Sequence, residues 1–266
     1  MQGLKERLKI LLPAPLTRFL IGLRYGWYGN YSSWEVAKRK CTGYDSIPIL
    51  EQVKESTGRV QRGLAKYERD SVIFKEVQYS YPLLSGLLWI AAKNKGKLHV
   101  MDYGGALGSS YYQNKSFLDT LADVKWCIVE QTHFVQTGKE DFSKGKLQFY
   151  DSIESCIQSN QIDLVLLSSV LQYLESPYKL LEEIQSSKIE NVIIDRTPYV
   201  MGPDRLTIQK VNPQIYPARY PCWFFNKTRF LDFMNSNYDM ILEFDALDRA
   251  NILSEFKGFI FKRKQS

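Results

Sequence analysis

The sequence of 266 residues has few cysteines, only two histidines and no long uninterrupted apolar run. The four cysteines are scattered through the chain, at Cys41, Cys127, Cys156 and Cys222. Their wide separation argues against a zinc site or a dense disulfide framework and favours reduced thiols in a cytoplasm. With His99 and His133 as the two histidines, no dedicated metal site is expected.

The apolar stretch near the start is interrupted by prolines and arginines, so neither a secretory signal nor a spanning helix is expected. A cytoplasmic protein is therefore predicted. The segment Leu4–Leu23 mixes apolar with basic side chains. Two interpretations fit this pattern: peripheral contact with an anionic membrane face, or a helix that packs on the domain.

Charge is unevenly distributed along the chain. Residues 1–97 carry 17 Lys and Arg against 8 Asp and Glu, a balance of +9, and residues 98–266 carry 18 against 21, a balance of −3. The basic surplus indicates an anionic partner for the first segment, or simply a solvated basic face. Neither a helix-turn-helix nor an aromatic-basic stripe is present, so nucleic acid is not an expected partner.

The pattern of apolar and polar residues differs between two parts of the chain, with a boundary near the polar residues 94–97. Residues 1–95 are predicted to form a mainly helical extension, and residues 96–266 the catalytic domain. Helical spacing in the extension occurs at Ile47–Glu55, Gly63–Lys66 and Pro82–Lys93.

After residues 94–97, short apolar runs alternate with helical patterns such as Ser110–Ala122 and Pro177–Ser186. This alternation is typical of a parallel sheet with crossover helices. The predicted strands are Leu98–Asp102, Trp126–Glu130, Leu147–Tyr150, Asp163–Leu167 and Asn191–Asp195. Because these runs are nearly continuous, both faces of the sheet should be covered.

The end of the chain departs from this alternation. A helix at Lys227–Ser236 leads to two runs, Met240–Leu247 and Lys257–Lys262, whose short connection suits an antiparallel hairpin. Five parallel strands closed by such a hairpin are typical of the α/β class I methyltransferases, which have a Rossmann-like seven-stranded sheet. A dinucleotide dehydrogenase would more often continue the alternation.

A glycine-rich turn follows the first predicted strand, at residues 102–108. Glycines let a backbone approach a ligand closely, and the helix that follows presents free N–H groups. Asp102 at the strand end would face the cationic amino-acid part of S-adenosylmethionine (SAM), whereas it would repel a dinucleotide pyrophosphate. The D-x-G-x-G-x-G pattern is met at Asp102, Gly104 and Gly108, with Gly105 inside the turn and Ala106 replacing the middle glycine. The alternative is a tight helix–strand contact without a ligand.

Glu130 lies 22 residues beyond Gly108, at the end of the second strand, where a carboxylate can accept both ribose hydroxyls. His133 could lie over the adenine or cap the next helix. Asp151 is the candidate for the adenine amino group, or else a surface-loop residue. The other predicted cofactor contacts are Gln131, Ser168 and Ser169.

Several separated segments resemble a family of bacterial SAM-dependent methyltransferases found with surface-polysaccharide genes. They are Val100–Tyr112, Val129–Gln131, Ser168–Leu174, Asp195–Pro198 and Gln214–Tyr220. The likeness extends over roughly residues 25–262, and its departure is Ala106, where the family more often has glycine. The resemblance implies a small-molecule or lipid-linked sugar acceptor, such as a precursor of O-antigen or capsule.

Polar residues after the fourth and fifth strands are the candidates for chemistry. Asp195 is predicted to be a general base or to bind a sugar hydroxyl, and Arg196 to clamp a phosphate or carboxylate of the acceptor. Alternatively, these two residues pair with each other or brace the following loop. Gln172 and Tyr173 are predicted to orient the acceptor or the cofactor.

The stretch from Tyr199 to Phe225 is rich in proline and aromatic residues and is predicted to be a long loop that acts as a lid. Aromatic faces beside polar groups suit a sugar ring, although they could equally anchor the loop to the core. The predicted acceptor-site residues are Tyr111, Tyr112, Gln209, Tyr216, Tyr220 and Trp223.

Three classes of function remain open from the sequence. The favoured one is an active methyltransferase, followed by a catalytically silent, cofactor-binding partner of a glycan-assembly complex. A NAD-dependent sugar oxidoreductase is the third.

Overall fold

A computed structural model describes residues 25–43, 47–143 and 145–265, so the segment Leu4–Leu23 lies outside the described residues. Five parallel strands form the centre of the sheet, in the order β6-β5-β4-β7-β8. They span Lys97–Tyr103 (β4), Asp123–Val129 (β5), Leu147–Tyr150 (β6), Leu164–Ser168 (β7) and Asn191–Val200 (β8). Each predicted strand is therefore confirmed, and β8 is longer than expected.

The predicted C-terminal hairpin is also present. Strand β12 (Glu255–Arg263) pairs antiparallel with β8 on one side and with β11 (Tyr238–Asp245) on the other. The sheet thus runs β6-β5-β4-β7-β8-β12-β11, with β12 as the antiparallel strand. This strand order is that of the class I methyltransferase fold.

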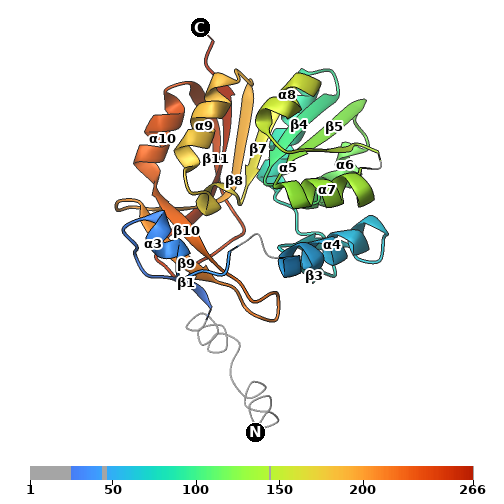
Figure 1. Cartoon of the computed structure of the whole chain (residues 1–266). Coiled ribbons are helices and arrows are strands. Elements are labelled where there is room, and N and C mark those ends of the chain that lie inside the picture. The colour runs from blue at the N-terminus through green and yellow to red at the C-terminus, as the bar shows by residue number, and fades with distance from the viewer. Residues whose placement is uncertain (1–24, 44–46, 144, 266) are drawn as a thin grey trace.

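Helices cover both faces of the sheet (Figure 1). One core joins the sheet to α5, α6 and α7, and a second joins the other face to α8, α9 and α10. Adjacent residues of one strand belong to different cores, as Val100 and Met101 of β4 do, because side chains alternate along a strand. The helices are α5 Tyr81–Lys93, α6 Ser109–Leu118, α7 Thr132–Asp141, α8 Ile153–Ser159, α9 Pro177–Ser186 and α10 Lys227–Asn235, with a short 3-10 turn, η1, at Leu171–Tyr173.

The stretch predicted as a long loop from Tyr199 to Phe225 is instead mostly strand, so that prediction is wrong. Strands β9 (Arg205–Lys210) and β10 (Arg219–Asn226) pair antiparallel, and β1 (Gly26–Tyr28) adds to the free side of β9. Strand β10 also pairs with the end of β8, which joins this extension to the main sheet. The loop was predicted because prolines are rare inside strands. Pro221 nevertheless lies within β10, opposite Ile208.

The described part of residues 1–95 is not only helical. It contains α3 (Trp34–Lys38), α4 (Ile47–Gln61) and α5, as well as β1 and a hairpin of β2 (Tyr67–Arg69) and β3 (Val72–Phe74). The predicted helical turn at Gly63–Lys66 is wrong, because that segment is a bend between α4 and β2. The boundary at residue 95 remains a prediction.

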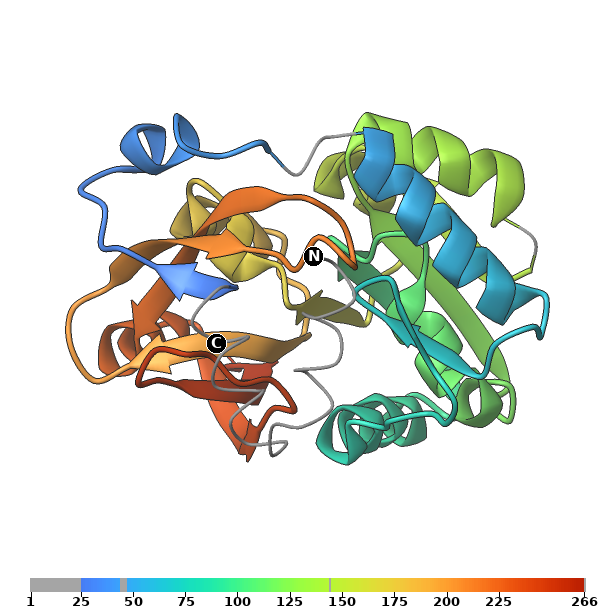
Figure 2. The ribbon, with the colours of Figure 1, turned by 90° about the horizontal axis from the view of Figure 1, so that it is seen from below.

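Figure 2 looks onto the edge of the sheet where the parallel strands end. The β1/β9/β10 extension lies on one side of this edge, and α4 with the β2–β3 hairpin lies on the other. Chain segments distant in sequence therefore enclose the edge at which ligands bind in open α/β sheets. Within the described residues, no helix is long and apolar enough to cross a membrane.

Candidate cofactor and acceptor site

The glycine-rich turn connects β4 to α6 in a conformation that needs small residues. Gly104 has a φ of +72°, and a Cβ there would lie 2.4 Å from the side chain of Val170. A Cβ on Gly105 would lie 2.5 Å from the Asp102 carboxylate. Ala106 also has a positive φ, of 50°, which glycine would adopt with less strain. The turn is thus closely fitted against β4 below and the segment after β7 beside it.

Asp102 lies beneath this turn instead of at the surface of the cavity. Its side chain is 1% exposed, and its Oδ2 accepts a hydrogen bond of 2.9 Å from the indole Nε1 of Trp126. Burial raises the pKa of Asp102 to about 7, against the opposing effect of the Trp126 hydrogen bond. The predicted direct contact of Asp102 with the cofactor is therefore corrected, because Gly105 covers the carboxylate. The carboxyl group can act on a ligand only by a longer-range electrostatic interaction.

A cavity of about 660 Å³ opens above the turn and is lined by Gly104, Gly105 and Ala106. Glu130 enters it from the end of β5, and its Oε1 accepts a 3.3 Å hydrogen bond from the backbone N–H of Ala106. Burial raises the pKa of Glu130, although backbone N–H groups of Gln131 and Ala106 oppose the effect. The cofactor turn and the predicted ribose carboxylate thus lie on one wall.

Four more of the predicted cofactor residues line the same cavity, namely Gln131, Asp151, Ser168 and Ser169. Gly108 and His133 do not lie among the lining residues. Gly108 is the N-cap of α6 with a φ of 103°, so its role is to begin that helix. His133 is in the first turn of α7, whose N-cap is Gln131, so the capping interpretation is corrected, and the adenine contact stays a prediction. Its ring lies 4.9 Å from that of Phe134.

A β-bulge within β8, where its parallel pairing with β7 ends, brings two polar residues to the cavity. Asp195 and Arg196 face a single residue of β12, Gly258, because the register shifts between the pairs Ile194–Phe259 and Thr197–Lys257. Arg196 has a φ of 56°. Consecutive residues of a regular strand point to opposite faces, and the bulge lets both residues line the cavity.

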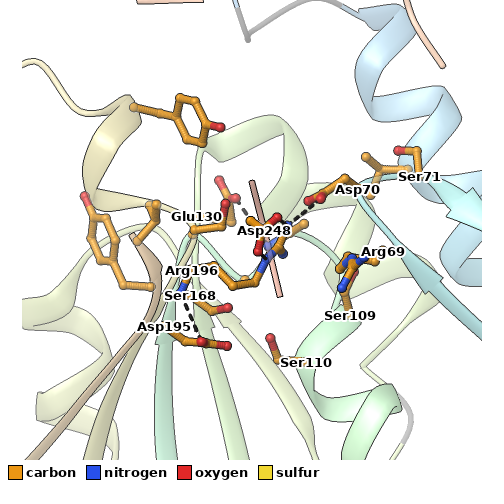
Figure 3. Close-up of a pocket in the computed structure, with 18 of the residues that line it drawn as sticks. Arg69, Asp70, Ser71, Ser109, Ser110, Glu130, Ser168, Asp195, Arg196 and Asp248 are labelled. Atoms are coloured by element: carbon orange, nitrogen blue, oxygen red, sulfur yellow. Dashed lines mark hydrogen bonds and ion pairs between the residues drawn. The ribbon is translucent and has the colours of Figure 1, made fainter. Parts of the chain in front are cut away.

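Asp195 and Arg196 differ in what their side chains contact. Asp195 is 2% exposed, and burial raises its pKa to about 6 while the nearby Arg196 charge lowers it. The Arg196 guanidinium binds Asp248 with both Nε (2.7 Å) and Nη2 (3.0 Å), and Nη2 also pairs with Asp70 (Figure 3). Two carboxylates of the protein thus occupy this guanidinium. The predicted clamp on an anionic acceptor group is therefore corrected to an internal brace, joining three segments of the chain.

The two residues predicted to orient ligands after β7 have separate roles. Gln172 is 1% exposed and lies outside the cavity, where its Nε2 donates to Ser169 Oγ (3.1 Å) and to the backbone oxygen of Arg196 (3.2 Å). Its predicted ligand contact is corrected to a brace between the end of β7 and the β8 bulge. Tyr173 does line the cavity, and its hydroxyl donates to Gln209 Oε1 at 2.7 Å.

The predicted acceptor residues fall into two groups. Gln209, Tyr216 and Tyr220 line the cavity, and the Tyr220 ring meets that of Tyr173 edge to face at 5.2 Å. The remaining three predictions are wrong, because their side chains pack elsewhere: Tyr111 against Trp126, Tyr112 against Tyr111, and Trp223 stacked on Trp34.

Sequence reasoning missed the β2–β3 hairpin, which lines the cavity with Glu68, Arg69, Asp70 and Ser71. Its turn residues Asp70 and Ser71 have φ values of 51° and 66° without being glycine. A two-residue hairpin normally shows Asn-Gly or Asp-Gly, so Asp-Ser gave only a weak signal. Trp27 and Asp248, also on the cavity wall, come from distant segments that carry no motif.

Among the described residues, no group of three or more His, Cys, Asp or Glu side chains is placed to hold a metal ion. The charged residues of the cavity are seven acids and two arginines. They are Glu68, Asp70, Glu130, Asp151, Glu183, Asp195 and Asp248, with Arg69 and Arg196.

No protein-family profile and no curated protein matches the chain. Solved structures with a similar fold include the N-terminal domain of EvdMO1 with S-adenosylhomocysteine (SAH) bound, at 12% identity and a TM-score of 0.48 over 82% of this chain and 96% of that chain. Another is magnesium protoporphyrin IX methyltransferase from Synechocystis PCC 6803 with bound SAH, at 15% identity and a TM-score of 0.48 over 82% and 99%. The N-methyltransferase NodS from Bradyrhizobium japonicum WM9 in complex with SAH has 8% identity and a TM-score of 0.43 over 70% and 87%. The strand order itself assigns this chain to the class I methyltransferase fold.

Proposed function

We propose that this protein is a SAM-dependent methyltransferase that acts on a sugar or glycan precursor of a surface polysaccharide. The observation that carries the proposal is that one cavity collects the glycine turn after β4, the Glu130 carboxylate after β5 and Asp195 of the β8 bulge. The turn and Glu130 follow the carboxyl ends of their strands, and Asp195 pairs with Ser168, the last residue of β7. All three therefore lie at the edge where open α/β sheets bind their ligands.

The lining of the cavity fits SAM better than a dinucleotide. Glu130 is a buried carboxylate beside the turn, and a carboxylate can accept hydrogen bonds from both hydroxyls of a ribose. Seven acids against two arginines favour the cationic sulfonium and ammonium groups. The same charge would oppose a pyrophosphate dianion.

When bound, SAM supplies an electrophilic methyl group to an acceptor held in line with it. Asp195 would receive the proton of an acceptor hydroxyl at its carboxylate, and a pKa of about 6 keeps it ionised, yet basic, near neutral pH. The backbone N–H of Arg196 donates to Asp195 Oδ1 at 3.0 Å, which fixes the direction of the carboxylate. The same bulge thus supplies both the base and its orientation.

The aromatic wall supports a sugar as acceptor. Tyr173, Tyr216 and Tyr220 present ring surfaces, and Gln209 is held among them by the Tyr173 hydroxyl. A sugar ring stacks its C–H face on aromatic rings while its hydroxyls bond to polar groups. We further propose that the basic segment Leu4–Leu23 contacts an anionic membrane face, where lipid-linked acceptors are found.

Two measurements test this proposal. Calorimetry with SAM, SAH and NAD should show binding of SAM and SAH and none of NAD; tight NAD binding without a response to SAH would instead indicate an oxidoreductase. Incubation of isotope-labelled SAM with extracted nucleotide sugars and lipid-linked glycans should transfer label. Binding of SAH without any transfer would indicate the silent partner of a glycan-assembly complex.

A further inference from the structure

The two arginines of the cavity are in different electrostatic situations. Arg196 already pairs with Asp248 and Asp70. Arg69 lines the cavity from the end of β2, and its Nη1 is buried without a hydrogen-bond partner in the part of the chain that the structure describes. A buried guanidinium donor without an acceptor is costly, so this position suits an anionic group brought by a ligand.

The hairpin that carries Arg69 is attached to the start of α6. Ser109 donates a hydrogen bond to Glu68, the residue before Arg69, and Gln113 Nε2 donates to the Tyr67 hydroxyl at 3.1 Å. Arg69 and Ser109 both line the cavity (Figure 3). The guanidinium is further positioned over the Phe74 ring, 5.4 Å from its centroid. Arg69 is therefore held at the point where the glycine turn passes into α6.

We infer that Arg69 binds the carboxylate of the amino-acid part of SAM, an inference that rests on the proposed function. If the ribose lies at Glu130, the amino-acid part lies over Gly104 and Gly105 and reaches the start of α6, where Ser109 and Ser110 also line the cavity. Acids surround this region, so a carboxylate needs a specific cation there, and Arg69 has a buried donor without a partner among the described residues.

The inference makes the hairpin a recognition element for the cofactor. Glutamate and aspartate side chains around the cavity favour the sulfonium and ammonium groups of SAM, and Arg69 favours its carboxylate. A zwitterionic amino-acid tail would thus be distinguished from a plain nucleoside, because only the former satisfies both charges. Strained turn residues Asp70 and Ser71 hold the hairpin in this place, with Asp70 tied to Arg196.

The test compares ligands that differ in one group. In the wild-type protein, SAH should bind at least tenfold more tightly than 5′-methylthioadenosine, which lacks the amino-acid tail, and SAM more tightly than decarboxylated SAM, which lacks only the carboxylate. Arg69→Gln should weaken SAM and SAH binding at least tenfold and leave the Kd of decarboxylated SAM within twofold. Arg59→Gln, at an exposed site on α4, is the matched control and should change neither.

Equal wild-type affinities for SAM and decarboxylated SAM would overturn the inference without any variant. So would an Arg69→Gln protein that binds SAH normally but has a raised KM for the acceptor, because Arg69 would then bind the acceptor. A wild-type protein that binds none of these ligands would refute the proposed function instead, which keeps the two failures distinct.

Discussion

The two halves of the cavity are built in different ways. The cofactor half is made by the ends of adjacent parallel strands, whose register with one another fixes the glycine turn, Glu130 and Ser168. The acceptor half is assembled from the β8 bulge, β9–β10 and the loop with Asp248, and the Arg196 ion pairs join it to the β2–β3 hairpin. Backbone hydrogen bonds set the first half, whereas side-chain charges hold the second, so substitutions should affect them separately.

Asp195→Asn is expected to give the largest difference between the effect on turnover and the effect on cofactor binding. Loss of the base should lower turnover by roughly 10² to 10⁴-fold, while the Kd for SAH stays unchanged because the cofactor half is intact. Labelled methyl transfer and calorimetry on one preparation check this, with Asp245→Asn at an exposed position as the control. Since the pKa of Asp195 is about 6, the wild-type rate should rise with pH through that value. Full activity of Asp195→Asn would show that Asp195 is not the general base.

Asp102 should make the stability of the unliganded protein depend on pH. Its pKa is about 7 in the folded state against an ordinary 3.8, so the folded protein holds a proton that the unfolded chain has lost between these values. The free energy of unfolding should therefore fall as pH rises from about 4 to about 7, by on the order of 3 kcal/mol from this group.

Asp102→Asn should remove that part of the slope, so urea unfolding at pH 5 and pH 8 should differ less in the variant than in the wild type. Asp195 and Glu130 have raised pKa values as well and keep the rest of the slope. Identical slopes in the two proteins would show that Asp102 is ionised throughout.

A smaller loss of stability is expected when an ion pair of Arg196, which holds the acceptor half together, is broken. Asp248→Asn leaves the buried Arg196 guanidinium with Asp70 as its remaining carboxylate partner, which should cost about 2 kcal/mol of unfolding free energy. The KM for the acceptor should rise, whereas SAH binding should not change. Chemical denaturation and steady-state kinetics measure these effects. A loss of SAH affinity as large, in fold-change, as the rise in the acceptor KM would contradict the independence of the two halves.

The smallest effect is expected in the cofactor turn itself. Ala106 has a positive φ, so Ala106→Gly should relieve strain and stabilise the protein by about 0.5 kcal/mol after the entropic cost of glycine. The same substitution at exposed Ala92 in α5 should instead destabilise the protein by about 1 kcal/mol. Thermal unfolding of both variants provides the comparison, and equal destabilisation would mean that the turn is unstrained.

The difference between the two halves also explains what the sequence could predict. The parallel strands, the C-terminal hairpin and the position of Glu130 follow from local patterns, because a strand, turn and helix are contiguous in the chain. The positions of Arg69 and Asp248 depend on pairing and ion pairs between distant segments, which no local pattern encodes. Tyr111 and Trp223 show the same limit, since an aromatic residue has the same local pattern whether it faces the cavity or the core.

The central claim is that the cavity binds SAM with Glu130 on the ribose. Calorimetric titration of SAH into the wild-type protein, Glu130→Gln and the exposed α8 control Glu154→Gln tests it most directly. The account predicts one SAH bound per chain in the wild type and the control, and affinity at least tenfold lower in Glu130→Gln with its folding retained. Absence of SAH binding by the wild type, or equal affinity in all three proteins, would contradict it.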